Sequence, residues 1–229
     1  LSGEPTSTLR FGEIWHFFEQ QLNYPITVVD SDYMERVDFT KYDVLILPGG
    51  RRYKGFLDTD KLKELKDWVS NGGKLIAMGG SIKGLTGEDG FKIRPKEIVK
   101  DSSKNLQIFD ETQRESIKKS ITGAIFKTKV DNTHPLAYGY SDTYFTLKLG
   151  ADAYEHLDRG SVVYLEGDSG MPVAGFAGSE AQKKITNTLV FGVEKHGSGQ
   201  VIYMVDNPLF RGFWENGKLL FANALFMVN

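Results

Sequence analysis

A short glycine-rich turn, Gly79-Gly80-Ser81, is the part of this sequence whose residue types and position are best suited to chemistry. It directly follows an uncharged apolar run, residues 75–78, which is typical of a parallel strand buried on both faces. A strand that turns sharply into a helix presents one side chain at the carboxyl edge of the sheet. Many α/β hydrolases place a nucleophile and its oxyanion site there. The turn here contains two glycines, and the chain contains no Cys, so the predicted geometry lacks the usual nucleophile.

A second glycine turn, Pro48-Gly49-Gly50, ends an earlier apolar run. Because glycine has no Cβ, its backbone N–H group can face a bound anion or an oxyanion at close range. We therefore expect a small-anion pocket where the two strands end. Its predicted lining residues are Gly49, Gly50, Gly79, Gly80, Ser81, Asn207 and Arg211. The alternatives are tight turns that bind no ligand and a structural salt bridge for Arg211.

Ser81 and His134 are the two catalytic candidates. A small serine hydrolase would use the Ser81 hydroxyl as nucleophile and His134 as base, which requires the two side chains within about 3.5 Å or one water of each other. The turn lacks the second Gly of G-x-S-x-G. Ser81 also fits a helix N-cap, and His134 precedes Pro135 in a sequence typical of a surface turn. No two His residues are spaced i, i+3 or i+4, so we expect no metal site and no cofactor.

The apolar periodicity predicts strands that alternate with helices around these turns. The expected elements are an amphipathic helix over 11–22, strands over 26–29 and 42–47, a helix capped by Asp58 or Thr59, and a strand over 75–78. This alternation predicts an α/β fold, a flavodoxin-like three-layer arrangement around a doubly wound, mostly parallel sheet. Such folds begin with a strand, and only Leu1-Ser2 is left to form it, so we expect the first strand to be truncated.

The second half of the chain is predicted to be β-rich. The expected strands cover 125–130, 144–149, 162–165, 172–177, 189–194 and 201–205. The last two flank His196-Gly197-Ser198-Gly199, which favours an antiparallel hairpin, and a closing helix covers 217–228. Residues 86–123 are polar in their first part and predict an insertion or a flap over the strand edge. Because no linker or repeat is visible, we expect a single domain over residues 1–229.

The composition argues against several classes of function. A formal net charge of −2 over 229 residues gives no basic surface for nucleic acid. No apolar run approaches the roughly 20 residues that a membrane span needs. The absence of Cys excludes disulfides and thiol catalysis. The chain opens Leu1-Ser2-Gly3 without Met and without a visible signal peptide, so we expect a processed or excised piece of a longer protein.

Two stretches make the chain resemble the class I glutamine amidotransferase-like proteins. They are residues 42–50, Y-D-V-L-I-L-P-G-G, and the strand and turn over 74–81. In that family the first supplies the oxyanion loop, and the second carries the nucleophilic Cys at the position that Gly79 has here. The family's catalytic His follows a late strand, where Asn207 stands in this chain, and Leu209 replaces the acid beyond it. The resemblance therefore implies the fold of an amidotransferase without its two essential side chains.

Three further segments, 11–19, 206–214 and 220–226, are similar to the C-terminal amidotransferase-like domain of some bacterial secreted zinc carboxypeptidases. This resemblance implies a catalytically inactive accessory domain that serves binding, packing or stability. Its partner would be the peptidase domain of the same polypeptide, and its location would be extracytoplasmic, periplasmic or secreted. The zinc-binding His, Glu and His of such a peptidase have no counterpart in these residues. We therefore expect no enzyme activity from this domain alone.

Overall fold

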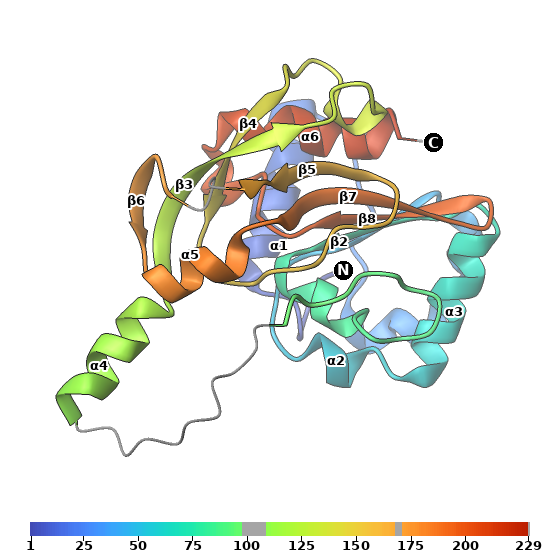
Figure 1. Ribbon diagram of the computed structural model, residues 1–229. Helices are drawn as coiled ribbons and strands as arrows, with labels where there is room; N and C mark the ends of the chain where they lie inside the picture. Colours follow the sequence, from blue (N-terminus) through green and yellow to red (C-terminus); the bar gives the residue numbers. More distant parts are fainter. Residues whose placement is uncertain (98–108, 168–170, 229) are drawn as a thin grey trace.

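A computed structural model describes residues 1–97, 109–167 and 171–228 of the chain. Within them, eight strands form one mixed, strongly curled sheet in the order β1-β2-β8-β7-β5-β3-β4, with β6 beside β3 (Figure 1). The strands are β1 Val44–Leu47, β2 Lys74–Met78, β3 Ile121–Val130, β4 Thr143–Lys148, β5 Ser161–Leu165, β6 Ala174–Ala177, β7 Thr188–His196 and β8 Gly199–Met204. The α-helices are α1 Thr8–His16, α2 Tyr53–Phe56, α3 Thr59–Ser70, α4 Phe109–Lys118, α5 Ser179–Ile185 and α6 Glu215–Phe226. A π-helix, η1 Phe17–Leu22, and short 3₁₀ helices, among them η4 Gly79–Gly84 and η5 Pro135–Ala137, complete these elements.

The prediction of a flavodoxin-like, doubly wound, mostly parallel sheet is wrong. Only β1, β2 and β8 run parallel to one another, whereas β8–β7, β7–β5, β5–β3, β3–β4 and β3–β6 are antiparallel pairs. The reason lies in the connections, because a parallel pair needs a long crossover that usually contains a helix. The β7–β8 connection is instead the tight turn at Gly197-Ser198, which confirms the predicted hairpin. The β-rich second half therefore continues the sheet in antiparallel fashion.

The prediction of a strand over residues 26–29 is also wrong. These residues belong to no ladder, and the nearest pairing is an isolated parallel bridge between Ser2 and Asp30. A strand requires backbone pairing with a neighbour, and an apolar groove lies between this segment and β1. Residues 26–29 therefore line this groove without joining the sheet.

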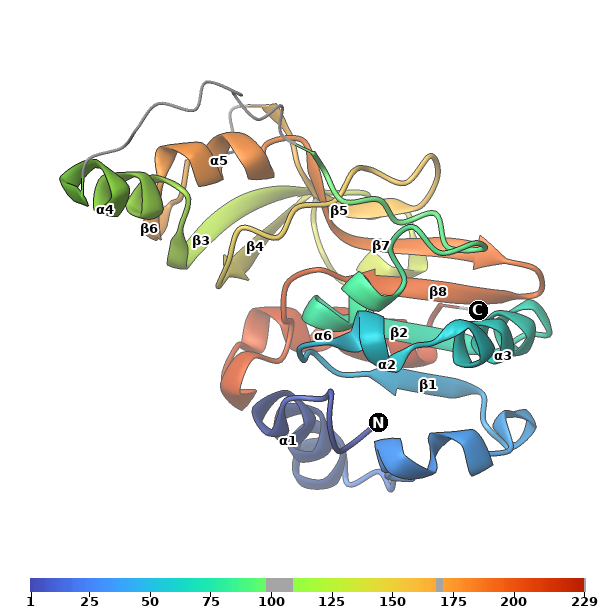
Figure 2. The ribbon, with the colours of Figure 1, turned by 90° about the horizontal axis from the view of Figure 1, so that it is seen from below.

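Helices cover both faces of the parallel part of the sheet. In Figures 1 and 2, α1 and α6 lie on one face, and α2 and α3 lie on the other. One core joins Ile14 and Phe221 to Ile76 of β2, and the other joins Leu65 to Leu75 of the same strand. All five residues of β2 are buried, as the unbroken apolar run predicts for a strand with two covered faces.

Local signals place several boundaries well. The Asp58 side chain accepts a hydrogen bond from the Lys61 backbone N–H at 2.9 Å, which confirms it as the cap of α3. Gly72 follows the same helix with a φ of +113°, a value that suits glycine. Residues 98–108 of the expected 86–123 insertion lie outside the described residues. Its later part contains α4, which lies next to α5 at the periphery (Figure 1), and the flap stays a prediction.

Candidate functional site

The carboxyl ends of β1, β2 and β8 meet at a polar crevice of about 450 Å³. Each strand contributes the turn that follows it: Gly49 and Gly50 after β1, Gly79 and Gly80 after β2, and Asn207 after β8. This edge of an α/β sheet is where ligands usually bind. The structure thus brings five of the predicted lining residues together around one cavity, while their binding of a ligand stays a prediction.

Gly79 has a left-handed backbone and open space at the place where a Cβ would lie. Its φ is +51°, a value that is strained for any residue with a Cβ. A Cβ added here would lie 4.0 Å from its nearest neighbours, the Gly49 Cα and the Val205 carbonyl oxygen. A Cβ on Gly80, by contrast, would lie 2.0 Å from the Gly50 carbonyl oxygen. Gly80 is therefore required by the contact between the two turns, whereas position 79 is spatially open.

Ser81 is completely buried, and its hydroxyl group serves the backbone. The Ser81 Oγ accepts a hydrogen bond from the Met78 N–H at 2.8 Å. It lies 2.9 Å from the Leu47 carbonyl oxygen and 3.0 Å from that of Met78, to either of which it donates. Ser81 thus joins the ends of β1 and β2 and is not among the residues that line the crevice.

His134 lies in the loop after β3, where it caps η5. Its Nδ1 accepts a hydrogen bond from the Leu136 N–H at 3.1 Å, and burial lowers the pKa of the imidazole. Among the residues that the structure describes, no hydrogen bond joins Ser81 to His134. The nucleophile–base contact that the serine hydrolase alternative requires is therefore not made here.

Glu13 of α1 organises one wall of the crevice, and the sequence analysis missed it. Its carboxylate accepts hydrogen bonds from the Asn207 Nδ2 at 2.6 Å, from the Arg211 backbone N–H at 2.7 Å and from the Arg10 Nη1 at 3.0 Å. Asn207 is thereby fixed in place by Glu13. The Arg211 side chain lies against the ring of Phe210, 5.1 Å from its centroid, and lines a neighbouring cavity. A signal was present in the sequence, since Arg10 and Glu13 are spaced i, i+3.

A buried ion pair holds the turn that precedes Asn207. Lys148 of β4 is 1% exposed and donates to both carboxylate oxygens of Asp206, at 2.9 and 3.1 Å. The Thr146 hydroxyl adds a third hydrogen bond at 2.7 Å. Thr146 and Lys148 share one face of β4 because side chains alternate along a strand. No sequence signal joins them to Asp206, since the contact depends on how the sheet curls.

Most charges around the crevice are paired within the protein. Arg10 pairs with Glu13, and Lys83 pairs with Asp152 at 2.9 Å. Arg51 lies on the rim, is exposed, and makes no ion pair with any residue in the described part of the chain. It is therefore the cation that an entering anion would meet without first breaking a salt bridge.

A buried tyrosine, Tyr53, holds the turn at Pro48-Gly49-Gly50 through a hydrogen bond to its backbone. The Tyr53 hydroxyl donates to the Pro48 carbonyl oxygen at 2.8 Å and shares a second hydrogen bond of 2.8 Å with the Thr6 hydroxyl. Burial raises the pKa of Tyr53, since the phenolate would lose its hydration there. The side chain is a neutral support for the turn and supplies no proton at ordinary pH.

The lining of the crevice limits the chemistry that it can do. None of its described lining residues is a His or a Cys. In the described ranges, no group of three or more His, Cys, Asp and Glu residues is arranged to hold a metal ion. No helix within the same ranges combines the length and apolar character that crossing a membrane requires. What the described lining offers is two glycine turns, the paired charges of Arg10 and Lys83, and Arg51 at the rim.

Comparison with solved structures identifies the fold. The structural neighbours include ThuA-like proteins, which have a class I glutamine amidotransferase-like fold, and the chain shares that fold. No protein-family model matches the chain, and no curated protein matches it.

Three neighbours illustrate the likeness. A ThuA-like protein from Parabacteroides merdae matches with a TM-score of 0.57 at 12% identity, over 97% of this chain and 86% of the other. A protein described as a GMP synthase component from Thermoplasma acidophilum matches with a TM-score of 0.56 at 12% identity, over 98% and 90%. A β-galactosidase from Bacillus circulans sp. alkalophilus matches with a TM-score of 0.50 at 14% identity. The match covers 98% of this chain and 28% of the β-galactosidase chain. None of these links the chain to zinc carboxypeptidases, so the peptidase partner and the extracytoplasmic location stay predictions.

Proposed function

We propose that this chain is a catalytically inactive amidotransferase-like module that serves a larger protein as an accessory domain. The observation that carries the proposal is the state of the nucleophile turn. Gly79 keeps a φ of +51° and an open space for a side chain that it does not have. The position that corresponds to the family's His is taken by Asn207, whose amide is bound to Glu13. A turn that lacks both a nucleophile and a base supports a structural role for this domain and argues against acyl transfer.

The β-galactosidase neighbour supports the accessory part of the proposal. In that protein the matching region is 28% of the chain, so the same fold occurs as one part of a larger polypeptide. Such a domain contributes packing surface or stability, and it needs no chemistry of its own.

Hydrolysis assays test the proposal directly. We expect neither glutamine nor p-nitrophenyl acetate to be hydrolysed above the buffer rate by the native protein or by Ser81→Ala. Ser81→Ala keeps the crevice lining, because Ser81 is buried beneath it. Turnover by the native protein that disappears in Ser81→Ala would contradict the proposal and revive the serine hydrolase.

Binding of a small anion in the crevice is a second candidate function. It is favoured by Arg51, which stands at the rim beside two glycine turns and pairs with no acid among the described residues. Calorimetric titration with phosphate or acetate at low salt should show binding that Arg51→Gln weakens several-fold. Arg52→Gln, next to it and also exposed, should leave the affinity unchanged. Equal affinity in both variants would remove Arg51 from the site.

A further inference from the structure

A second cavity, of about 850 Å³, shares a wall with the crevice, because Arg10 and Glu13 of α1 line both. The turn over 210–213 and Leu149, which follows β4, also line it. Its described lining residues include neither glycine turn of the crevice and no residue of a strand. Its volume lies in the range of pockets that bind small molecules, so it is a candidate site in its own right.

Three large apolar side chains are exposed around this cavity. Leu9 is 75% exposed, Phe213 is 59% exposed and Leu149 is 41% exposed. Single exposed apolar side chains are common on protein surfaces, but several of them around one hollow with a polar rim indicate an interaction site. The cavity therefore offers apolar contacts to a group that enters it.

Arg211 supplies the uncompensated charge of the cavity. Its guanidinium lies 5.1 Å from the centroid of the Phe210 ring, and it makes no ion pair with any acid in the described ranges. Arg10 lies 5.6 Å from the same centroid but pairs with Glu13 at 3.0 Å. Because Arg10 and Glu13 cancel, the lining carries one net positive charge when His16 is neutral. A carboxylate is the complementary group.

The backbone of Arg211 is held in an uncommon conformation. Its φ is +51°, a value that residues with a Cβ rarely adopt. Its N–H donates to the Glu13 carboxylate at 2.7 Å, and cation–π attraction holds the guanidinium on Phe210. Residues kept in such conformations often occur at ligand-binding sites. The charge is thus in position before a ligand arrives, which lowers the entropic cost of binding.

We propose that this cavity binds a small free acid in which an aromatic ring lies a few bonds from a carboxylate. The ring packs against Phe213 and Leu149, and the carboxylate pairs with the planar guanidinium of Arg211, which suits two parallel hydrogen bonds. The proposal goes beyond the inactive accessory domain, since it assigns a ligand class to a cavity outside the crevice. It holds whether or not the crevice itself binds an anion.

Both parts of the ligand are required. An ion pair with an exposed guanidinium contributes little in water, so a carboxylate alone should bind weakly. A ring alone gains from apolar burial but leaves the Arg211 charge without a partner. A longer peptide would need main-chain partners, which a sheet edge usually supplies, and the described lining contains no strand residue. These contacts therefore favour a free small molecule.

A titration followed by nuclear magnetic resonance tests the proposal at low salt. Hydrocinnamate should shift the Gly212 and Phe213 N–H signals until they saturate. Propionate, which lacks the ring, and hydrocinnamyl alcohol, which lacks the charge, should each bind at least fivefold more weakly. The proposal fails if hydrocinnamate gives no saturable shift, or if either of the other two compounds binds as well.

Two pairs of variants assign the contacts. Arg211→Gln should weaken hydrocinnamate binding at least fivefold, whereas Arg159→Gln, at an exposed position outside the cavity, should not change it. Phe213→Ala should also weaken binding at least fivefold. Phe176→Ala, which removes a ring that is 47% exposed on β6, is its control. Equal affinities within either pair would overturn the assignment, and the unshifted signals of each variant show that it is folded.

Two further outcomes would place the ligand elsewhere or change its class. If Arg51→Gln weakens hydrocinnamate binding and Arg211→Gln does not, the carboxylate lies in the crevice, which overturns this inference and leaves anion binding there intact. Conversely, failure of phosphate or acetate to bind in the crevice leaves the hydrocinnamate result unaffected. If the peptide acetyl-Gly-Gly-Phe binds at least tenfold more tightly than hydrocinnamate, the cavity takes the carboxyl end of a polypeptide and the free acid is excluded.

Discussion

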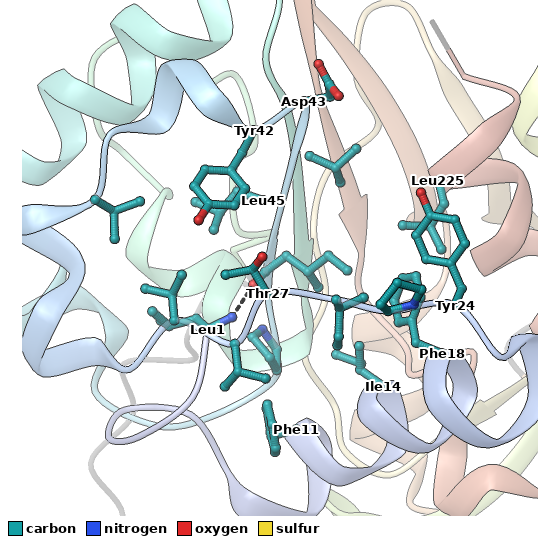
Figure 3. Close-up of a pocket in the computed structure, with 18 of the residues that line it drawn as sticks. Leu1, Phe11, Ile14, Phe18, Tyr24, Thr27, Tyr42, Asp43, Leu45 and Leu225 are labelled. Atoms are coloured by element: carbon teal, nitrogen blue, oxygen red, sulfur yellow. Dashed lines mark hydrogen bonds between the residues drawn. The ribbon is translucent and has the colours of Figure 1, made fainter.

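The polar crevice and the apolar groove both border β1, yet their hydrogen-bonding groups are in opposite states. In the crevice, the Glu13 carboxylate receives hydrogen bonds from three separate residues, and the Asp206 carboxylate receives them from two side chains. In the groove between β1 and residues 26–29 (Figure 3), the outer edge of β1 receives one hydrogen bond from the residues that the structure describes, and its donor is the Leu1 amino group. The Glu13 and Asp206 carboxylates of the crevice are therefore satisfied within the protein, whereas most of the outward-facing backbone groups of β1 have no partner among the described residues.

Removing the cation of the buried Lys148–Asp206 pair should lower the stability of the protein most. Lys148→Met leaves the Asp206 carboxylate buried without its charge partner, and we expect the free energy of unfolding to fall by about 3–5 kcal/mol. Urea denaturation monitored by circular dichroism measures the change. Lys183→Met removes an exposed partner of Glu180 and should change stability by no more than about 0.5 kcal/mol. Similar losses in both variants would show that the buried pair does not hold the crevice.

The two neighbouring glycines of the β2 turn should respond very differently to alanine. Gly80→Ala places a Cβ against the Gly50 carbonyl oxygen and should cost about 3 kcal/mol, as overpacking does when backbone must move. Gly79→Ala meets open space and should cost about 1 kcal/mol, because only the positive φ opposes it. Thermal or urea unfolding of the pair gives both values. A larger loss for Gly79→Ala would mean that position 79 is not open to a nucleophile.

Glu13→Gln should weaken the crevice by an intermediate amount. The amide presents an N–H₂ group to donors that now meet a carboxylate oxygen, so at least one hydrogen bond is lost, at a cost of about 2 kcal/mol. Glu64→Gln, an exposed residue of α3, is the matched control and should remain within about 0.5 kcal/mol of the native protein. If the two variants unfold at the same urea concentration, the Glu13 hydrogen bonds contribute nothing net.

These contrasts also show which parts of the molecule the sequence predicts. The glycine turns, the apolar runs of β1 and β2, and the Asp58 cap depend on neighbouring residues, and local patterns identify them. The crevice lining at Gly49, Gly79 and Asn207 followed from the family resemblance combined with the rule that parallel strands end together. Their meeting around one cavity is the part of the candidate site that the sequence predicted.

The sequence alone could not predict the contacts that hold the crevice in shape. Lys148 and Asp206 lie 58 positions apart, and Glu13 and Asn207 lie 194 apart. Periodicity carries information over one helix or strand and none over such separations. The error in the sheet has the same origin, because the order and direction in which the strands of the second half pair depend on contacts between segments far apart in the sequence.

The pH dependence of stability should distinguish the groove from the crevice, with the smallest expected effect. Burial lowers the pKa of the Leu1 amino group from 8.0 to about 6, so between these values the unfolded chain binds more protons than the folded chain. Stability therefore rises with pH across this window and is lost as the pH falls toward 6. Two full pH units set an upper limit of about 2.7 kcal/mol. Partial exposure of Leu1 reduces the expected gain to about 1 kcal/mol.

Acetylation of the Leu1 nitrogen is the control for this prediction. It removes the titrating amine and leaves every other group in place, including His134 and His156, whose pKa values are also lowered by burial. The free-energy difference between the free and the acetylated chain should change by about 1 kcal/mol between pH 6 and 8. Parallel pH profiles would mean that the amino group is hydrated rather than inside the groove. In that case water would satisfy the backbone groups at the outer edge of β1, just as side chains satisfy the carboxylates of the crevice.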